Sequence, residues 1–138
     1  MSPPPPTVST EIELVLVVAN GPDRPVHAEL SYSPDDPYAV RVAFHTGTSE
    51  TVEWTFARSL LTDGVTHPVG VGDVQVWPRT SRSNPMVCLS LSSPTGCALF
   101  EAPLTRIVHF LTETYAVIPT GAESRFIDLD AELDRLIR

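Results

Sequence analysis

The chain has 138 residues, of which 42% are hydrophobic and 19% are charged. These proportions are typical of a globular domain with one core, and they exclude a chain that is disordered throughout. The net charge is −8, and all nine cationic residues are arginine. An acidic domain repels a phosphate backbone, so the composition argues against nucleic-acid binding except through a local arginine patch.

Residues 1–10 contain four consecutive prolines, and such a run favours an extended polyproline II conformation. We therefore predict a disordered, proline-rich tail over 1–10, with a docking motif for a proline-reading domain as the alternative. The start of the chain lacks the basic and apolar regions of a secretory signal, and the longest apolar run, 14–19, is too short to cross a bilayer. These features predict a single cytoplasmic domain over 11–138, which reaches a membrane only through a partner.

Four apolar or alternating stretches predict the first strands of the domain. The segments between them are rich in Asn, Gly, Pro and Asp, which are turn-forming residues. Four antiparallel strands joined by such short turns form a meander sheet. The predicted strands cover residues 11–19, 26–32, 38–45 and 51–56.

The stretch from Thr51 to Pro78 contains both tryptophans and two glycine corners. After Phe56 the pattern predicts a short helix over 57–62, which ends at a glycine in the cap position. A tight reversal over 68–73 and a fifth strand over 74–77 follow. Aromatic side chains bury large areas, so we expect the two halves of the fold to meet in this stretch. Its structural signature consists of Trp54, Phe56, Gly64, Gly70, Gly72 and Trp77.

The segment from Arg79 to Pro85 is predicted to be a mobile polar loop, and residues 87–102 are predicted to form a hairpin with Pro94 and Thr95 at its turn. In this register, cross-strand partners have numbers that sum to 189. Cys88 then lies opposite Glu101 rather than opposite Cys97, so both thiols are expected to be free.

The remaining elements are two predicted helices. One opens at Pro103, has apolar residues at three-and-four spacing and ends near Ile118, because Pro119 disfavours helix before it. The other begins at Asp128. The whole pattern predicts an α+β fold, in which antiparallel sheets of about seven or eight strands pack with one short and two longer helices.

No strong catalytic or ligand motif is present, so neither an enzyme nor a cofactor nor a metal is expected. The chain has no phosphate-binding loop with its lysine, no HExxH and no paired CxxC, and the two glycines at 70 and 72 lack the context of a dinucleotide fingerprint. The four histidines follow no ligand spacing, and we expect separate histidines; convergence of His45, His67 and Asp63 is the alternative. Asp35 and Asp36 are expected to cap backbone amides in a turn.

Three surfaces are candidates for contact with partners. They are the strand face with Arg41 and His45, the short helix with Arg58, and the hairpin face with Cys88. Arg79 and Arg82, beside Trp77, form either a solvated loop or a basic–aromatic patch of the kind that holds single-stranded nucleic acid.

Six segments resemble the SsgA-like proteins of actinomycetes. The resemblance extends from about Thr7 to the C-terminus, and the run Pro3–Pro6 departs from the family pattern. The segments are DPYAVRVAFHTG (36–47), ETVEWTFARSLLTDGV (50–65), GVGDVQVWP (70–78), CLSLSSPTGCALFEAP (88–103), VIPTGAE (117–123) and DLDAEL (128–133).

The resemblance implies a non-enzymatic adaptor of sporulation-linked cell division, located in the cytoplasm at the division septum. Such proteins mark septum sites and help to recruit and position the tubulin-like GTPase FtsZ, together with SsgA. The implied fold is similar to that of the whirly-type single-stranded nucleic-acid binders and forms an oligomer, with a trimer favoured. A whirly-like nucleic-acid-binding module is the alternative function, although a shared fold does not transfer binding and the acidic charge opposes it.

Overall fold

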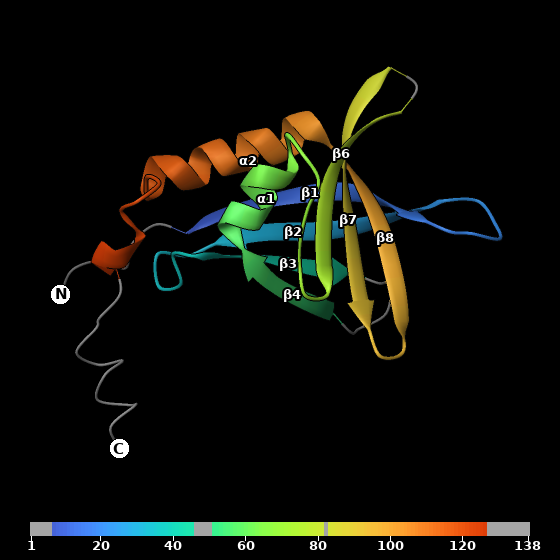
Figure 1. Ribbon diagram of the computed structural model, residues 1–138, viewed down its shortest axis with the longest axis horizontal. Coiled ribbons are helices and arrows are strands. Elements are labelled where there is room, and N and C mark those ends of the chain that lie inside the picture. Colours follow the sequence, from blue (N-terminus) through green and yellow to red (C-terminus); the bar gives the residue numbers. More distant parts are fainter. Residues whose placement is uncertain (1–6, 46–50, 82, 127–138) are drawn as a thin grey trace.

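The computed structural model describes residues 7–45, 51–81 and 83–126 (Figure 1). The four-proline run, Arg82 and the helix predicted from Asp128 lie outside the described residues. Within them, the chain forms one antiparallel sheet, two α-helices and a short 3-10 helix.

The sheet has eight strands in the described residues, in the order β4-β3-β2-β1-β8-β7-β6-β5. The predicted meander of the first four strands is confirmed, and the eighth strand continues the sheet beside the first. The strands are β1 (Val8–Val17), β2 (Arg24–Tyr32), β3 (Ala39–His45), β4 (Thr51–Ala57), β5 (Val69–Val71), β6 (Val74–Ser81), β7 (Asn84–Ser93) and β8 (Gly96–Pro103).

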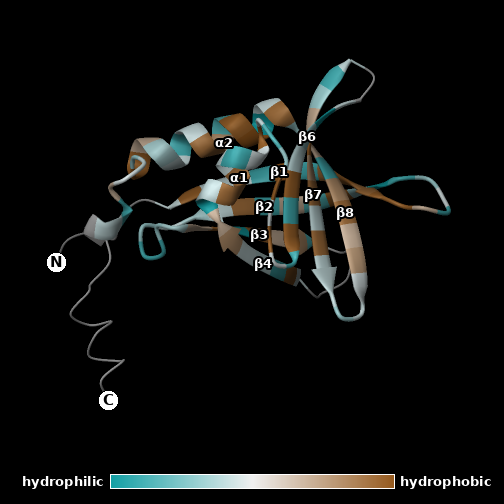
Figure 2. Cartoon of the chain, viewed as in Figure 1, coloured by the Kyte–Doolittle hydropathy of each residue, from teal (hydrophilic) through white to brown (hydrophobic). Residues whose placement is uncertain are grey.

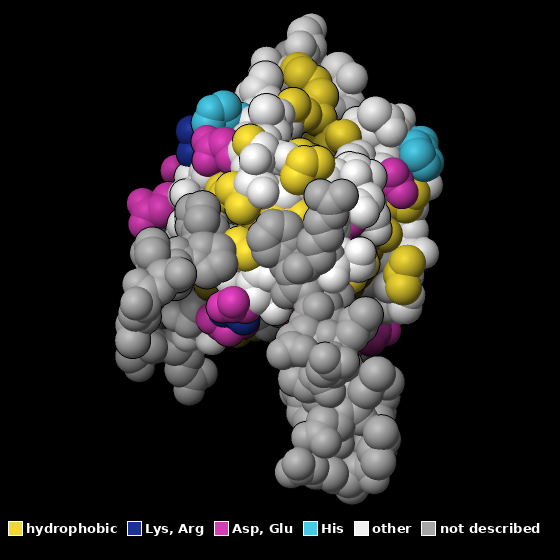
Figure 3. Space-filling view, turned by 90° about the vertical axis from the view of Figure 1, so that its left-hand side faces the viewer, with side chains coloured by type: hydrophobic (Ala, Val, Ile, Leu, Met, Phe, Trp, Pro, Cys, Tyr) yellow, Lys and Arg dark blue, Asp and Glu magenta, His cyan; other side chains and the backbone are white. Residues whose placement is uncertain are grey.

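The sheet is strongly curled, so β1–β4 run across the direction of β6–β8 (Figure 1). Helix α2 (Leu104–Val117) packs against β1, β7 and β8, and the shorter α1 (Arg58–Gly64) lies between β4 and the β5–β6 pair. The 3-10 helix η1 (Glu123–Phe126) follows α2. Viewed from the end of the molecule at which η1 lies, hydrophobic side chains are interspersed with acidic and other polar ones (Figure 3).

The core fills the concave side of the curled sheet. Alternate residues of each strand point inward, which gives the alternating hydropathy along the strands in Figure 2. The rings of Phe44 and Phe100 stack with centroids 4.5 Å apart and thereby join the two halves of the sheet. Ile107, Phe110 and Leu111 of α2 cover the same core from above.

The central stretch 51–78 links the two edges of the sheet, because β4 is one edge strand and β5 is the other. Helix α1 contacts both β4 and the β5–β6 pair, as expected for a joint between the two halves. A Cβ on Gly64 would lie only 2.3 Å from Cγ1 of Val76, so this close approach of α1 to β6 requires glycine. The two tryptophans do not pack together at this joint. Trp54 is on the inner face of β4, whereas Trp77 alternates with the buried Val76 and faces outward.

The hairpin register is confirmed, because Cys88 pairs with Glu101 and Ser92 with Cys97, and both cysteines are free. The predicted mobile loop over 79–85 is wrong. Strand β6 continues to Ser81 and β7 begins at Asn84, with Ser83 in the left-handed region at φ 68°. These residues extend a two-stranded ribbon beyond the core, where polar side chains are compatible with strand pairing and give no alternating pattern to detect.

The predicted reversal over 68–73 contains a further strand. Val69–Val71 pairs with β6 through a turn at Gly72, whose φ of 60° suits glycine. Gly70 lies within β5. A strand of three residues is too short to show periodicity in the sequence.

Candidate functional site

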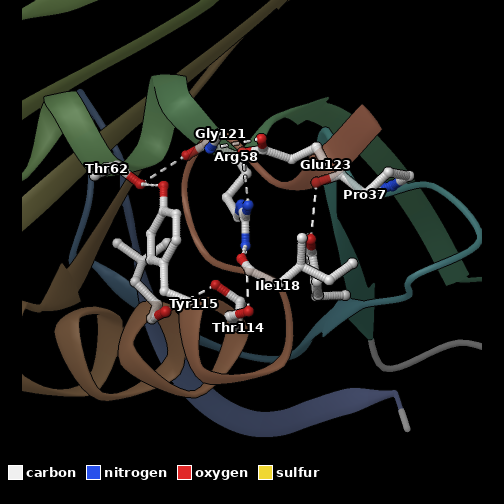
Figure 4. Close-up of polar contacts among 10 residues, drawn as sticks. Pro37, Arg58, Thr62, Thr114, Tyr115, Ile118, Gly121 and Glu123 are labelled. Carbon is white, nitrogen blue, oxygen red and sulfur yellow. Dashed lines mark hydrogen bonds and ion pairs between the residues drawn. The ribbon is translucent and has the colours of Figure 1, made fainter. Parts of the chain in front are cut away.

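Arg58, which the sequence analysis placed on a partner surface, is buried at the start of α1 with 2% exposure. Its guanidinium donates to the carbonyl oxygens of Thr114 (3.2 Å) and Ile118 (2.9 Å) and to the Glu123 carboxylate (2.8 Å) (Figure 4). The prediction of a surface role for Arg58 is therefore wrong. Arg58 caps the C-terminal end of α2, which is far away in the sequence. A single arginine that follows a strand gives no indication of such a distant partner.

Two tyrosine rings enclose this guanidinium. Its central carbon lies 4.0 Å from the ring centroid of Tyr115 and 4.7 Å from that of Tyr32, distances at which an aromatic face attracts a cation. The Tyr32 hydroxyl donates to the carbonyl of Pro37 at 2.8 Å, and burial raises its pKa. Tyr115 and Thr62 hydroxyls are hydrogen-bonded, which ties α1 to α2. This cluster therefore holds the fold together and offers no surface for a ligand.

The outer, convex side of the sheet is where the structure brings other candidate residues together. One transverse row crosses four strands and contains Val15, Glu101, Cys88 and Trp77. Around it lies the outer patch, which we define as the half-buried apolar residues that face outward and do not belong to the core cluster. Its members are Val15, Val17, Trp77, Met86 and Leu99.

Glu101 lies beneath this outer patch with 9% exposure. Its Oε2 is 3.7 Å from Nη1 of Arg79, and it has no hydrogen-bond partner within the described part of the chain. The Arg79 side chain is about half exposed at 52%. Burial raises the pKa of the neighbouring Cys88 thiol, and the Glu101 charge raises it further. The outer patch contains Trp77 and Met86 and lies beside Arg79, three residue types that are enriched at protein interfaces, and the Glu101 charge beneath it is incompletely paired.

The other half of the outer face, over β2–β4 and the first part of β1, is polar. His45 stacks on His27 with centroids 5.4 Å apart, and Nε2 of His27 lies 3.7 Å from the Glu11 carboxylate. The expectation of separate histidines is therefore wrong for this pair, which adjacent strands bring together. Arg41 is exposed on the same face, opposite Ser31 and Thr55.

The remaining candidates do not assemble into a reaction centre. Nδ1 of His67 is hydrogen-bonded to Thr66 Oγ1 at 3.0 Å, within its own turn. Asp36 donates its backbone N–H to the Ser33 carbonyl, and the Asp35 N–H donates to the Ser33 hydroxyl. In the ranges that the structure covers, no three His, Cys, Asp or Glu side chains come together as metal ligands.

A cleft opens at the end of the molecule away from the Arg58 cluster. Its volume is about 660 Å³, within the usual range for binding pockets. Strands β3 and β4 contribute one wall and the β7–β8 hairpin contributes the other. The apolar lining includes Phe44, Val52, Trp54, Leu91, Ala98 and Phe100, and Arg24 is the charged residue beside them.

The sequence matches the protein family described as Streptomyces sporulation and cell division protein, SsgA, over residues 26–123, and the chain belongs to this family. Several of its relatives are named sporulation-specific cell division protein SsgB. One from Frankia casuarinae is 54% identical over 131 residues, covering 95% of this chain and 92% of the relative. Another, from Streptomyces coelicolor, is 51% identical over 131 residues, covering 95% and 96%.

Two solved structures share the fold, each with a TM-score of 0.87. The first, described in connection with SsgB mutations that correlate to longitudinal cell division during sporulation of Streptomyces coelicolor, is 50% identical and covers 92% of this chain and 100% of that chain. The second is the crystal structure of an SsgA-like sporulation-specific cell division protein from Thermobifida fusca, which is 45% identical and covers 98% of both chains. The predicted family is thus confirmed, as is the similarity to SsgB within it.

No helix among the described residues is long and apolar enough to span a membrane.

Proposed function

We propose that this protein is a non-enzymatic adaptor of sporulation-specific cell division, which marks septum sites and helps to recruit and position FtsZ. The observation that carries the proposal is the near full-length similarity to proteins named for sporulation-specific cell division, at 54% and 51% identity. An adaptor needs exposed contact surfaces rather than a reaction centre, and the outer patch with Arg79 provides such a surface.

The proposed partners are FtsZ, SsgA-type members of the family and further copies of this chain, with a trimer favoured. Several copies on one particle would engage a polymer at several points, which raises the overall affinity without any new contact. The proposed place of action is the cytoplasmic side of the division septum, with the membrane reached through partners. The mass of the particle in solution tests the oligomeric state directly.

Co-sedimentation with FtsZ polymers tests the recruitment. We expect the wild-type protein to pellet with the polymer, and Leu99→Asp, which places a charge on the outer patch, to remain in the supernatant. Val108→Asp is the matched control, because Val108 is an exposed apolar residue of α2 with 43% exposure. Failure of the wild type to pellet or to alter polymer length would rule out a direct contact.

The nucleic-acid alternative has no support from the relatives or the solved structures. The outer face over β1–β4 carries Glu11, Glu13 and Glu53, all exposed, and such carboxylates repel a phosphate backbone. Arg82, one of the two arginines on which the basic–aromatic patch depended, lies outside the described residues. We therefore do not propose this function.

A further inference from the structure

Strand β4 is an edge of the sheet. It pairs with β3 from Thr51 to Ala57, and along its other side no strand pairs with it in the part of the chain that the structure describes. An edge strand presents a row of N–H and C=O groups that can pair with a further strand. It contains no proline that would interrupt such pairing.

The cleft lies directly beside this edge. Val52 and Trp54 of β4 point into it, and Val52 keeps 46% of its surface exposed although it is apolar. Leu91 and Phe100 form part of the opposite wall. A segment that paired with β4 would direct every second side chain to the same face as Val52 and Trp54, at a spacing of roughly 6–7 Å along the cleft.

Arg24 provides a positive charge at this cleft. It forms no ion pair among the described residues, whose four salt bridges involve other cations. The domain is acidic overall, with a net charge of −8, so an available arginine beside an apolar cleft favours a carboxylate at that position.

We propose that β4 and the cleft bind an extended segment of a protein partner, which adds to the sheet as a strand, inserts alternating apolar side chains into the cleft and offers a carboxylate to Arg24. Backbone pairing supplies affinity in this mode, and pockets for alternate side chains supply specificity. The site lies at the edge and concave side of the sheet, whereas the outer patch is on its convex side. It is therefore a second contact surface, and it does not depend on FtsZ as the partner.

The experiment uses a phage-displayed library of random eight-residue peptides, selected on the full-length protein. We expect the selected peptides to share alternating apolar residues with an acidic residue near one end. Hydrogen exchange with a selected peptide bound should slow at the amides of β4. In a Trp77→Phe background, binding should also change the fluorescence of Trp54, the remaining tryptophan.

Three variants test the cleft: one changes its apolar lining, one is a matched control on α2, and one removes the charge of Arg24. Val52→Lys places a charge in the cleft and should weaken peptide binding by about tenfold or more, equivalent to roughly 1.4 kcal/mol. Val108→Lys alters a residue of closely similar exposure on α2 and should leave the affinity unchanged. Arg24→Gln should weaken binding severalfold and remove most of its dependence on salt. Thermal unfolding of each variant verifies that the domain still folds.

Several outcomes would overturn the proposal. They are selection of no common pattern, equal binding to Val52→Lys, or slowed exchange in β6–β8 instead of β4. If Val52→Lys reduces the mass of the particle in solution, the occupant of the cleft is a second copy of this chain and the proposal is wrong. Because purified protein and peptides suffice, failure here leaves the co-sedimentation result with FtsZ to be judged separately.

Discussion

Two arginine–glutamate pairs join distant parts of the chain, and they differ in how completely they are hydrogen-bonded. Arg58 and Glu123 are 2.8 Å apart, with Arg58 at 2% and Glu123 at 14% side-chain exposure. Arg79 and Glu101 are 3.7 Å apart, and here the glutamate is the more buried partner at 11%, whereas the arginine is 52% exposed.

In the first pair, both charges are satisfied. The planar guanidinium of Arg58 donates to two backbone carbonyls at the end of α2 and also to the carboxylate. A lysine ammonium is a single compact donor group and does not match this fork-shaped geometry. Glu123 accepts a further hydrogen bond from the N–H of Gly121 at 2.9 Å. The pair therefore fixes the chain after α2 against α1.

In the second pair, one buried oxygen of Glu101 lacks a hydrogen bond among the described residues. Taking a carboxylate out of water is costly unless hydrogen bonds replace the hydration, and a half-exposed arginine at 3.7 Å does not supply one. An ion pair therefore stabilises a fold through its hydrogen bonds rather than through its charges alone. The first pair belongs to the folding core, and the second leaves Arg79 available at the outer patch.

The largest effect is expected for Arg58→Ala. This substitution leaves Glu123 and two helix carbonyls without their partner and removes the cation between two rings, so it should lower the free energy of unfolding by about 3–5 kcal/mol. Urea denaturation measures the change. Arg41→Ala is the control, because Arg41 is exposed on β3, and it should change stability by less than about 0.5 kcal/mol. A loss below about 1 kcal/mol for Arg58→Ala would contradict the structural role.

Replacing each of the two glutamates by leucine should change the free energy of unfolding in opposite directions. Glu123→Leu leaves the buried Arg58 charge without its carboxylate and should lower the unfolding free energy. Glu101→Leu removes the unsatisfied oxygen from beneath the outer patch and should raise the unfolding free energy by about 1 kcal/mol. Equilibrium unfolding of both variants measures the two changes. Destabilisation of similar size in both variants would show that the two ion pairs contribute equally to stability.

The contribution of the Arg58–Glu123 pair to stability should depend on pH. Hydrogen bonds from its own backbone N–H, from Arg58 and from the Gly121 N–H hold the pKa of Glu123 below its ordinary value of 4.5. A lowered folded-state pKa adds stability that is complete above the ordinary value and is lost as the pH falls through the folded value. The advantage of the wild type over Glu123→Gln in thermal unfolding should therefore shrink below about pH 4.5. A constant difference from neutral to acidic pH would refute this.

Elements with strong local patterns could be predicted from the sequence. The hairpin over 87–102 was predicted with its register because its turn residues and alternation specify each other. The helix after Pro103 was predicted because its apolar residues recur at helical spacing, and its end was predicted because Pro119 disfavours helix in the residue before it. The strand pairing of 79–81 with 84–86 was missed, since these residues extend beyond the core and most of their side chains are polar, so they show no hydrophobic period.

The candidate sites were much harder to predict. Arg58 and Arg79 are equivalent in the sequence, as single arginines near a short helix and a strand, yet one is buried and the other is half exposed. Their difference depends on which distant groups the curled sheet brings near them, 65 residues away for Glu123. The cleft likewise arises between strands from both halves of the chain. Only tertiary contacts determine these features, and local patterns do not encode them.

The smallest effect is expected for Arg79→Ala. A half-exposed arginine at 3.7 Å from its partner should contribute less than about 1 kcal/mol to stability. A double-mutant cycle isolates the interaction: Arg79→Ala is measured in the wild type and in Glu101→Leu, and the two changes should agree within about 0.5 kcal/mol. The corresponding cycle with Arg58→Ala and Glu123→Leu should show a larger coupling energy, because the groups share direct hydrogen bonds. Equal coupling in the two cycles would mean that Arg79 closes onto Glu101 in solution and is not available to a partner at the outer patch.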